Sequence, residues 1–278
     1  MPRILLQTTI TPTEDDWHIG RFSRLAEHLA SLEGVEVTTR DRATPGGQTD
    51  PVIGGLADSD YDQLWLFAVD VGDGLNADEC AAIAAFRARG GGLMITRDHM
   101  DLGSSVCTLG GVGDAHYFHS SSQDPDASRN ARDDVETGYI DFPNYHSGSN
   151  GDWQTIRAEG ALHPLLRDGD GVLDRLPAHP HEGGIGVPPG ATARVIATGT
   201  SKVSSRPFNI AVAFEDAGKG RGLAQSTFHH FADYNWDPRL GCPTFVSEAP
   251  GDGMLRDPEA LRQTRQYMTN LASWLSGG

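Results

Sequence analysis

The feature that most constrains the fold is an alternation of short apolar runs and amphipathic segments over the first 97 residues. Four runs are expected to be strands, at residues 3–7, 35–39, 62–69 and 93–96. Two segments with helical spacing separate them, at 19–32 and 76–89. Residues 40–60 are polar and rich in Gly and Pro, and they are expected to form a loop. The second helix starts at a capping-box pair, Asn76 and Glu79, and ends at three glycines. This order is typical of a doubly wound α/β sheet.

Regular periodicity returns towards the C-terminus. Residues 193–198, 209–214 and 222–228 are expected to be strands, and 257–275 an amphipathic helix. Between these parts, residues 103–190 are rich in Gly, Ser, Asp, Asn and His. We expect a long irregular insertion there, over the carboxyl ends of the strands, with short helices near 102–109 and 153–167. No internal repeat or linker divides the chain, so residues 1–278 are predicted to form a single α/β domain.

The charge balance excludes several classes of partner. The chain has 38 acidic against 22 basic residues, a net charge of −16, and no basic run. Such a chain lacks the electrostatic footprint of a nucleic-acid binder and the polybasic segment that holds proteins on anionic membranes. No window approaches the roughly 20 apolar residues of a membrane span. The N-terminal apolar stretch is too short for a signal peptide, so a cytoplasmic location is the default expectation.

Cysteine usage points to no metal or disulfide framework. The three cysteines, Cys80, Cys107 and Cys242, form no CxxC pair. A homo-oligomer is compatible with the sequence, which does not decide the oligomeric state.

Histidine is concentrated where regular structure is lost. Of the 11 histidines, eight lie in the irregular region or at a strand end: His99, His116, His119, His146, His163, His179, His181 and His229. His230 adjoins the last of them. Histidine is the commonest metal ligand and a frequent general base near neutral pH. This density therefore indicates a functional site over the strand ends.

The individual histidine patterns differ in what they predict. His116 and His119 would share a face only in a helix, and His179 and His181 would lie on one side of an extended segment, where packing is the commoner role. His99 and His229 are the sharpest candidates, because each directly follows a predicted buried strand. Both are expected to project from the same edge of the sheet.

Two segments carry a resemblance to a known family. Residues 61–103 contain a strand, a helix that starts at LNADE and ends at GGG, a second strand, and a histidine just beyond it. Residues 218–229 run from a GKGR turn through a strand to His229. Together these segments resemble the ThuA-like (trehalose-utilisation) proteins of the class I glutamine amidotransferase-like superfamily. The resemblance covers about half of the chain. It implies a flavodoxin-like doubly wound sheet and a small, polar, carbohydrate-like substrate.

The sequence departs from the amidotransferase pattern at the residues that carry its chemistry. In that superfamily a strand–turn–helix elbow presents a cysteine, and a late histidine is followed closely by a glutamate. Here the elbow reads Arg97-Asp98-His99, Cys107 lies too far along, and Phe231 stands where the glutamate is expected. The resemblance therefore implies the fold without Cys-dependent glutaminase activity.

Imidazole and carboxylate at the elbow suit metal binding or acid–base chemistry better than covalent attack. We expect a divalent metal ion held by His99 and His229 with one or two of His116, His119 and Asp98. The predicted catalytic residues are His99, Asp98, His229 and Asp233. Trp17, Trp153, Trp236, Tyr145 and Tyr234 are candidates for stacking on a ring of the substrate.

Three functions remain open at this point. The first is a metal-assisted hydrolase or lyase that acts on a small polar, carbohydrate-like metabolite. The second is a metal-free enzyme that uses His99 or His229 as a base paired to Asp98 or Asp233. The third is a non-catalytic ligand-binding module on a retired amidotransferase fold.

Overall fold

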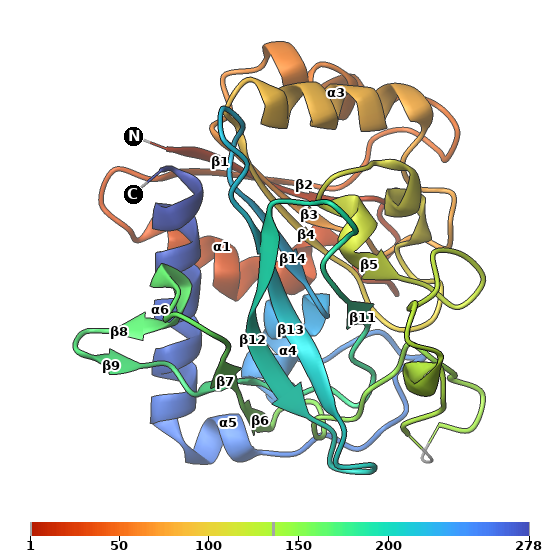
Figure 1. Cartoon of the computed structure of the whole chain (residues 1–278), viewed down its shortest axis with the longest axis vertical. Helices are drawn as coiled ribbons and strands as arrows, with labels where there is room; N and C mark the ends of the chain where they lie inside the picture. Colours follow the sequence, from red (N-terminus) through yellow and green to blue (C-terminus); the bar gives the residue numbers. More distant parts are fainter. Residues whose placement is uncertain (1, 135–136, 278) are drawn as a thin grey trace.

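The computed structural model describes residues 2–134 and 137–277, and its centre is an eight-stranded mixed sheet (Figure 1). Five strands are parallel: β2 (Glu36–Arg40), β1 (Arg3–Thr8), β3 (Gln63–Phe67), β4 (Gly92–Thr96) and β14 (Gly222–Gln225). Three antiparallel strands continue the sheet beyond β14: β13 (Pro207–Phe214), β12 (Ala193–Thr200) and β7 (Arg157–Ala158). The parallel part has the flavodoxin-like order 2-1-3-4-5. The predicted doubly wound α/β sheet is confirmed.

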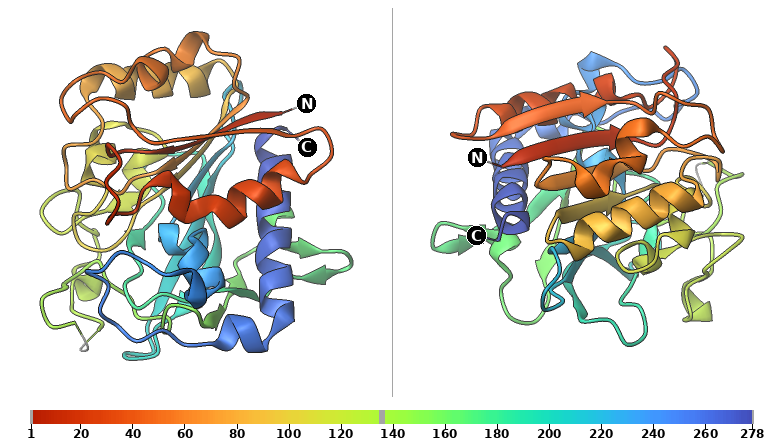
Figure 2. Two further views of the ribbon diagram at one scale, coloured as in Figure 1. Left: turned by 180° about the vertical axis from the view of Figure 1, so that it is seen from behind. Right: turned by 90° about the horizontal axis from the view of Figure 1, so that it is seen from above.

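Both faces of the parallel strands are buried, which explains their continuous apolar runs. In β3, Trp65 and Phe67 enter one hydrophobic core, whereas Leu64 and Leu66 enter the other. Helices α1 (Ser23–Ala30) and α6 (Pro258–Leu275) cover the first face. Helices α2 (Pro51–Gly54) and α3 (Ala77–Ala88) cover the second, so that the sheet lies between two helical layers (Figure 2).

Local chemistry fixes the helix α3 and the turns that follow it. The predicted capping box is present: Asn76 accepts from the backbone N–H of Glu79, and the Glu79 carboxylate accepts from the backbone N–H of Asn76. Glu79 also forms a buried ion pair of 2.9 Å with Arg42. The GGG and GKGR turns meet tightly, since a Cβ on Gly220 would lie 1.8 Å from the carbonyl oxygen of Gly91. Glycine is required there because any side chain would collide with backbone.

The remaining elements are short. The small strands are β5 (His116–Tyr117), β6 (Trp153–Thr155), β8 (Arg167–Asp168), β9 (Gly171–Val172), β10 (Arg175–Pro177) and β11 (Gly184–Ile185). The short α-helices are α4 (Asp233–Trp236) and α5 (Gly253–Arg256). The 3₁₀ turns are η1 (Ile19–Phe22), η2 (Leu56–Asp58), η3 (Ser104–Thr108), η4 (Gly113–Ala115), η5 (Ala127–Arg129), η6 (Pro164–Leu166), η7 (Phe228–His230) and η8 (Pro238–Leu240).

Three sequence predictions of local structure need correction. The helix expected at 153–167 is replaced by β6, β7 and η6, because β7 pairs with β12 at the edge of the main sheet. The loop expected at 40–60 contains α2 and η2, which pack against α3. The strand expected to reach Phe228 ends at Gln225, and residues 228–230 form the turn η7.

Between β4 and β12 the chain follows an irregular path of short elements. Tyr139, Asn150, His179 and His181 from this region line the same pocket as Asp98 and His229, which follow β4 and β14. The region therefore contributes about half of the groups at the strand ends. Within the described residues, no helix is both long and apolar enough to cross a bilayer.

Candidate metal and active site

The structure brings Asp98 and His229 together at the carboxyl edge of the sheet. Strands β4 and β14 are parallel neighbours in which Thr96 pairs with Gln225. Asp98 comes two residues after Thr96, and His229 follows Gln225 through the turn η7. His229 Nε2 consequently lies 3.6 Å from Asp98 Oδ2. His99 contacts the same carboxylate, with its Nδ1 3.0 Å from Asp98 Oδ2.

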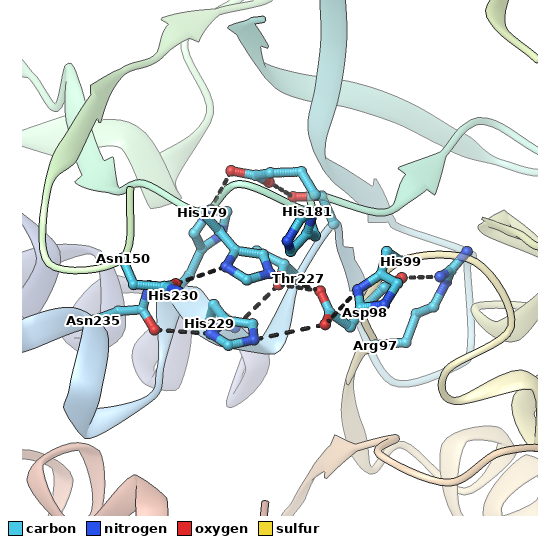
Figure 3. A network of polar contacts seen from close by, with 12 residues as sticks. Arg97, Asp98, His99, Asn150, His179, His181, Thr227, His229, His230 and Asn235 are labelled. Carbon is cyan, nitrogen blue, oxygen red and sulfur yellow. Dashed lines mark hydrogen bonds and ion pairs between the residues drawn. The ribbon is translucent and has the colours of Figure 1, made fainter. Parts of the chain in front are cut away.

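A third imidazole comes from the irregular region. His179 Nε2 lies 3.1 Å from Asp98 Oδ1, and the His179 ring stacks on that of His229 with 3.5 Å between centroids (Figure 3). One ligand atom each of Asp98, His99 and His179 lie within 4.8 Å of one another. The sequence had assigned the extended His179-Pro180-His181 segment to packing. The signal that could have identified His179 is the spacing of two residues between His179 and His181, which puts both side chains on one side of an extended segment.

Two asparagines determine which nitrogen of each ring carries the proton. Asn235 Nδ2 donates to the carbonyl oxygen of Ala178, 2.9 Å away, so its amide orientation is fixed. Asn235 Oδ1 therefore accepts from His229 Nδ1 at 2.9 Å. Asn235 Nδ2 also donates to Asn150 Oδ1, which in turn accepts from His179 Nδ1 at 2.8 Å. Both rings thus hold Nδ1–H, and both Nε2 atoms face Asp98.

The charge states follow from burial and from these neighbours. Burial by itself would raise the pKa of Asp98, but His99, His179 and His229 around it hold that pKa well below its ordinary value. Burial lowers the pKa of His179 well below its ordinary value, and the neighbouring His229 acts in the same direction. Asp98 is therefore an anion and His179 a neutral imidazole near neutral pH. These are the forms in which both groups bind metal ions.

Asp98 is also held by contacts outside the histidine group. The Thr227 hydroxyl donates to Asp98 Oδ1 at 3.2 Å. The preceding residue, Arg97, is fully buried and donates to the backbone carbonyls of Asp98 and Tyr117. Burial lowers the pKa of Arg97 to about 9, while Asp98 and Asp101 oppose this shift. The turn that carries Asp98 and His99 is thus fixed on several sides.

A pocket of about 360 Å³ opens above this group. Its buried end contains Asp98, His179 and His229, each 2% exposed. His181 lies beside them, with Nδ1 3.2 Å from Asp134 Oδ2 and Nε2 3.1 Å from Glu248 Oε1. The hydrogen bond from His181, followed by that from Thr137, lowers the pKa of Glu248 to about 2. Neither His181 nor Glu248 is among the metal-binding or catalytic residues predicted from the sequence.

Three of the residues predicted for the site have other surroundings and do not line this pocket. His116 lies in β5, fully buried, where burial followed by the charge of Arg97 lowers its pKa to about 3. His119 Nδ1 lies 3.1 Å from the carbonyl oxygen of Phe142. Asp233 accepts hydrogen bonds at the start of α1, from the backbone N–H of Ser23 and Arg24. The structure gives Asp233 the role of a helix cap.

The aromatic residues proposed for stacking are also divided by the structure. Trp17 lines the pocket and meets the His229 ring edge-on, with 4.7 Å between centroids. Tyr145 stacks on Phe208 in the core, and Trp236 is a core residue whose Nε1–H donates to the His230 carbonyl. Trp153 packs against Arg175, and Tyr234 is buried; neither lines this pocket.

Comparison with known proteins gives limited information. No protein-family model matches the sequence, and no curated protein is similar to it. Among solved structures, the chain is similar to the Trypanosoma brucei CTPS glutaminase domain with bound acivicin, at 15% identity and a TM-score of 0.45, covering 99% of this chain and 94% of the other. It is also similar to the carbohydrate deacetylase Agd3, at 15% identity and a TM-score of 0.42, covering 86% of this chain and 32% of the other. These values are too low to support an inference about activity, and membership of the ThuA-like family stays a prediction.

Proposed function

We propose that this chain is a metal-dependent hydrolase whose metal ligands are drawn from Asp98, His99, His179 and His229. The observation that carries the proposal is the pair of imidazoles whose Nδ1–H groups are held by Asn150 and Asn235. Their Nε2 lone pairs face one anionic carboxylate, and like-signed atoms repel at such distances. A cation between them removes the repulsion. An oxygen acceptor on the far ring nitrogen is also how metal-bound histidines are usually oriented.

The donor set fits a borderline divalent ion. Imidazole nitrogens and a carboxylate oxygen are ligands of Zn²⁺ and of other first-row metals. Bond lengths of about 2.0–2.2 Å around a tetrahedral ion would put neighbouring donor atoms roughly 3.3–3.6 Å apart. The separations of 3.0, 3.1 and 3.6 Å from the Asp98 oxygens to His99, His179 and His229 are close to this value. The net charge of −16 favours cation binding further.

Hydrolysis is the reaction that such a site serves best. A divalent ion held by these residues would supply a Lewis acid and would lower the pKa of a water molecule. The chain's own residues hold the ligands in place: Asn150 and Asn235 keep the protons on Nδ1, and Thr227 orients Asp98. With Asp98 and His99 at the elbow, a Cys-dependent glutaminase reaction is not proposed. The carbohydrate-like substrate is a prediction from the sequence alone. The lyase reaction, as the alternative to hydrolysis, is also a prediction from the sequence.

A second candidate is metal-free acid–base catalysis by the same residues. The contact of 3.1 Å between His179 Nε2 and Asp98 Oδ1 is also the length of a hydrogen bond, so a proton can serve as the cation. Activity that survives chelation but is lost in His179→Gln would select this alternative. Absence of metal binding, together with pocket variants that change no turnover, would favour the non-catalytic binding module.

The test is the metal affinity of the purified protein. We expect the wild type to bind one equivalent of Zn²⁺ in a calorimetric titration at neutral pH. Asp98→Asn and His179→Gln should lose more than about a hundredfold in affinity, because each removes a ligand. His119→Gln is the matched control, since its side chain lies outside the pocket. Wild-type protein that takes up no divalent metal, or an Asp98→Asn variant that binds as well as the wild type, would overturn the proposal.

A further inference from the structure

The most exposed large hydrophobic side chains of the described residues gather at one place. Val71 and Tyr139 are each 75% exposed, and Phe245 is 56% exposed. All three line the pocket above Asp98. They come from separate segments, one after β3, one in the irregular region and one between η8 and α5. A single exposed apolar side chain is ordinary, but three around one hollow indicate a surface that a ligand covers. We call Val71, Tyr139 and Phe245 the apolar collar.

The pocket is divided along its depth by polarity. Its buried end holds the carboxylate and the imidazoles, which are engaged with one another or with Asn150 and Asn235. The lining also includes four apolar side chains, Val69, Leu102, Ile140 and Val246, and the polar side chains of Asp16, His181 and Glu248. Glu248 already accepts hydrogen bonds from His181 and Thr137. Hydroxyl groups that faced the four apolar side chains would be left without a partner, which is costly.

We infer that the substrate carries an apolar aryl or short alkyl group next to the polar bond that reacts. The polar part lies at Asp98 and the histidines, and the apolar part lies against the walls and the collar. A volume of about 360 Å³ suits a molecule of one or two rings. This inference rests on the proposed function, and it replaces the expected carbohydrate-like substrate by one with an apolar part. Esters, amides or lactones of aryl or alkyl acids have this chemistry.

A substrate is a better occupant of the collar than a partner protein. The three side chains line a hollow that continues down to Asp98, and they do not extend a flat face. The other exposed large hydrophobics of the described residues, such as Val203 and Leu255, lie outside this pocket. The three most exposed large hydrophobic side chains of the described residues are thus all at the entrance of the site.

The experiment compares three hydroxamates that share one metal-binding group: acetohydroxamate, benzohydroxamate and gluconohydroxamate. Their dissociation constants are measured by calorimetry on the Zn²⁺-loaded protein. We expect benzohydroxamate to bind on the order of tenfold more tightly than acetohydroxamate, because its ring is removed from water, and gluconohydroxamate to gain nothing. The double variant Tyr139→Ser, Phe245→Ser should lose the preference for the aryl compound. The matched control is Val203→Ser with Leu255→Ser, which changes two exposed hydrophobics outside the pocket.

The outcomes separate this inference from the proposed function. One result is that the hydroxamates bind only in the presence of metal and show no preference for the aryl compound, or a preference for the sugar-like one. Either preference pattern overturns the apolar substrate and leaves the hydrolase proposal intact. Failure to bind metal overturns the hydrolase, and the same three compounds on metal-free protein then decide the apolar group, since ring contacts need no ion. Light scattering on the wild type and on the collar double variant tests the remaining occupant, a second copy of the chain. If the wild type is a dimer, the double variant is a monomer and the aryl preference is unchanged, the collar is a dimer contact and the inference is overturned.

Discussion

Two buried histidine–carboxylate assemblies lie side by side in the chain, and their imidazoles hold their protons on opposite nitrogens. In the pocket, His229 gives its Nδ1–H to Asn235 and turns a bare Nε2 towards Asp98. The next residue, His230, does the reverse. Gln225 Nε2 faces its Nδ1 at 2.7 Å, and its Nε2 lies 3.1 Å from Glu182 Oε1. The orientation of Gln225 is fixed because its Oε1 accepts from the Tyr267 hydroxyl.

The difference between the assemblies lies in the amides beside them. An amide oxygen next to Nδ1 leaves Nε2 as a lone pair, whereas an amide nitrogen next to Nδ1 makes Nε2 the donor. The Glu182 assembly is complete, since Ser147 and Ser226 also donate to the carboxylate. It ties the segment that carries His179 to the segment that carries His229. In the proposed function, a cation completes the Asp98 assembly. We therefore assign the Glu182 assembly to the stability of the fold and propose the Asp98 assembly for chemistry.

The largest expected effect comes from breaking the complete assembly. Glu182→Gln replaces a carboxylate oxygen, which accepts from Ser147, Ser226 and His230, by an amide N–H₂ that cannot accept, in a site that is 0% exposed. We expect the free energy of unfolding to fall by about 3 kcal/mol, as for other buried charged groups that lose a partner. Urea unfolding measures this loss, and Glu36→Gln, at an exposed surface position, is the control.

The Glu182 variant also tests the division of roles. Its folded fraction should bind Zn²⁺ with nearly the wild-type affinity, because Glu182 is not among the proposed ligands. A loss of metal affinity as large as that of Asp98→Asn, with unchanged stability, would contradict the assignment of Glu182 to the fold.

A smaller effect is expected from changing the proton position in the pocket. Asn235→Leu removes the acceptor from His229 Nδ1 and the donor to Asn150. The imidazoles are then free to take the other tautomer, and Zn²⁺ affinity should fall about 10- to 100-fold. Calorimetry on Asn235→Leu and on the conservative Asn235→Asp, which keeps an oxygen at Nδ1, checks this. Equal losses of Zn²⁺ affinity in both variants would show that Asn235 acts through packing and not through the proton position on His229.

The smallest expected effect, when expressed per pH unit, concerns histidines that belong to neither assembly. The pKa of His116 is lowered from 6.5 to about 3, chiefly by burial. Below pH 6.5 the unfolded chain binds this proton and the folded chain does not, so stability is lost as pH falls from 6.5 towards 3. His116→Leu should remove up to about 1.4 kcal/mol per pH unit from the slope of stability against pH in this window.

A second histidine sharpens that comparison. Burial lowers the pKa of His163 from 6.5 to about 4, so its contribution has the same sign over a narrower window. Urea unfolding of His116→Leu and His163→Leu between pH 7 and pH 4 measures both slopes. If both variants show the same slope of stability against pH as the wild type, burial does not change the protonation of either histidine on folding.

The sequence predicted the fold well because the relevant signals are local. Strands buried on both faces read as short apolar runs, and the capping box of Asn76 and Glu79 marks a helix start within four residues. The prediction failed at 153–167, where pairing of β7 with a strand some 40 residues later overrode local preference. No local pattern reports such a partner.

The sequence by itself predicted the doubly wound sheet and placed Asp98, His99 and His229 after predicted strands, which in such a sheet end at one edge. The pairing of β4 with β14, which brings these residues together, is a tertiary feature. Only the tertiary structure decided which other histidines join them. His179 enters because the irregular region folds back over the strand ends, whereas His116 is buried in β5 and His119 contacts a backbone carbonyl. The tertiary structure also set the proton positions. These depend on whether an amide oxygen or an amide nitrogen from a distant segment faces each ring, and a count of histidines carries no information about that orientation.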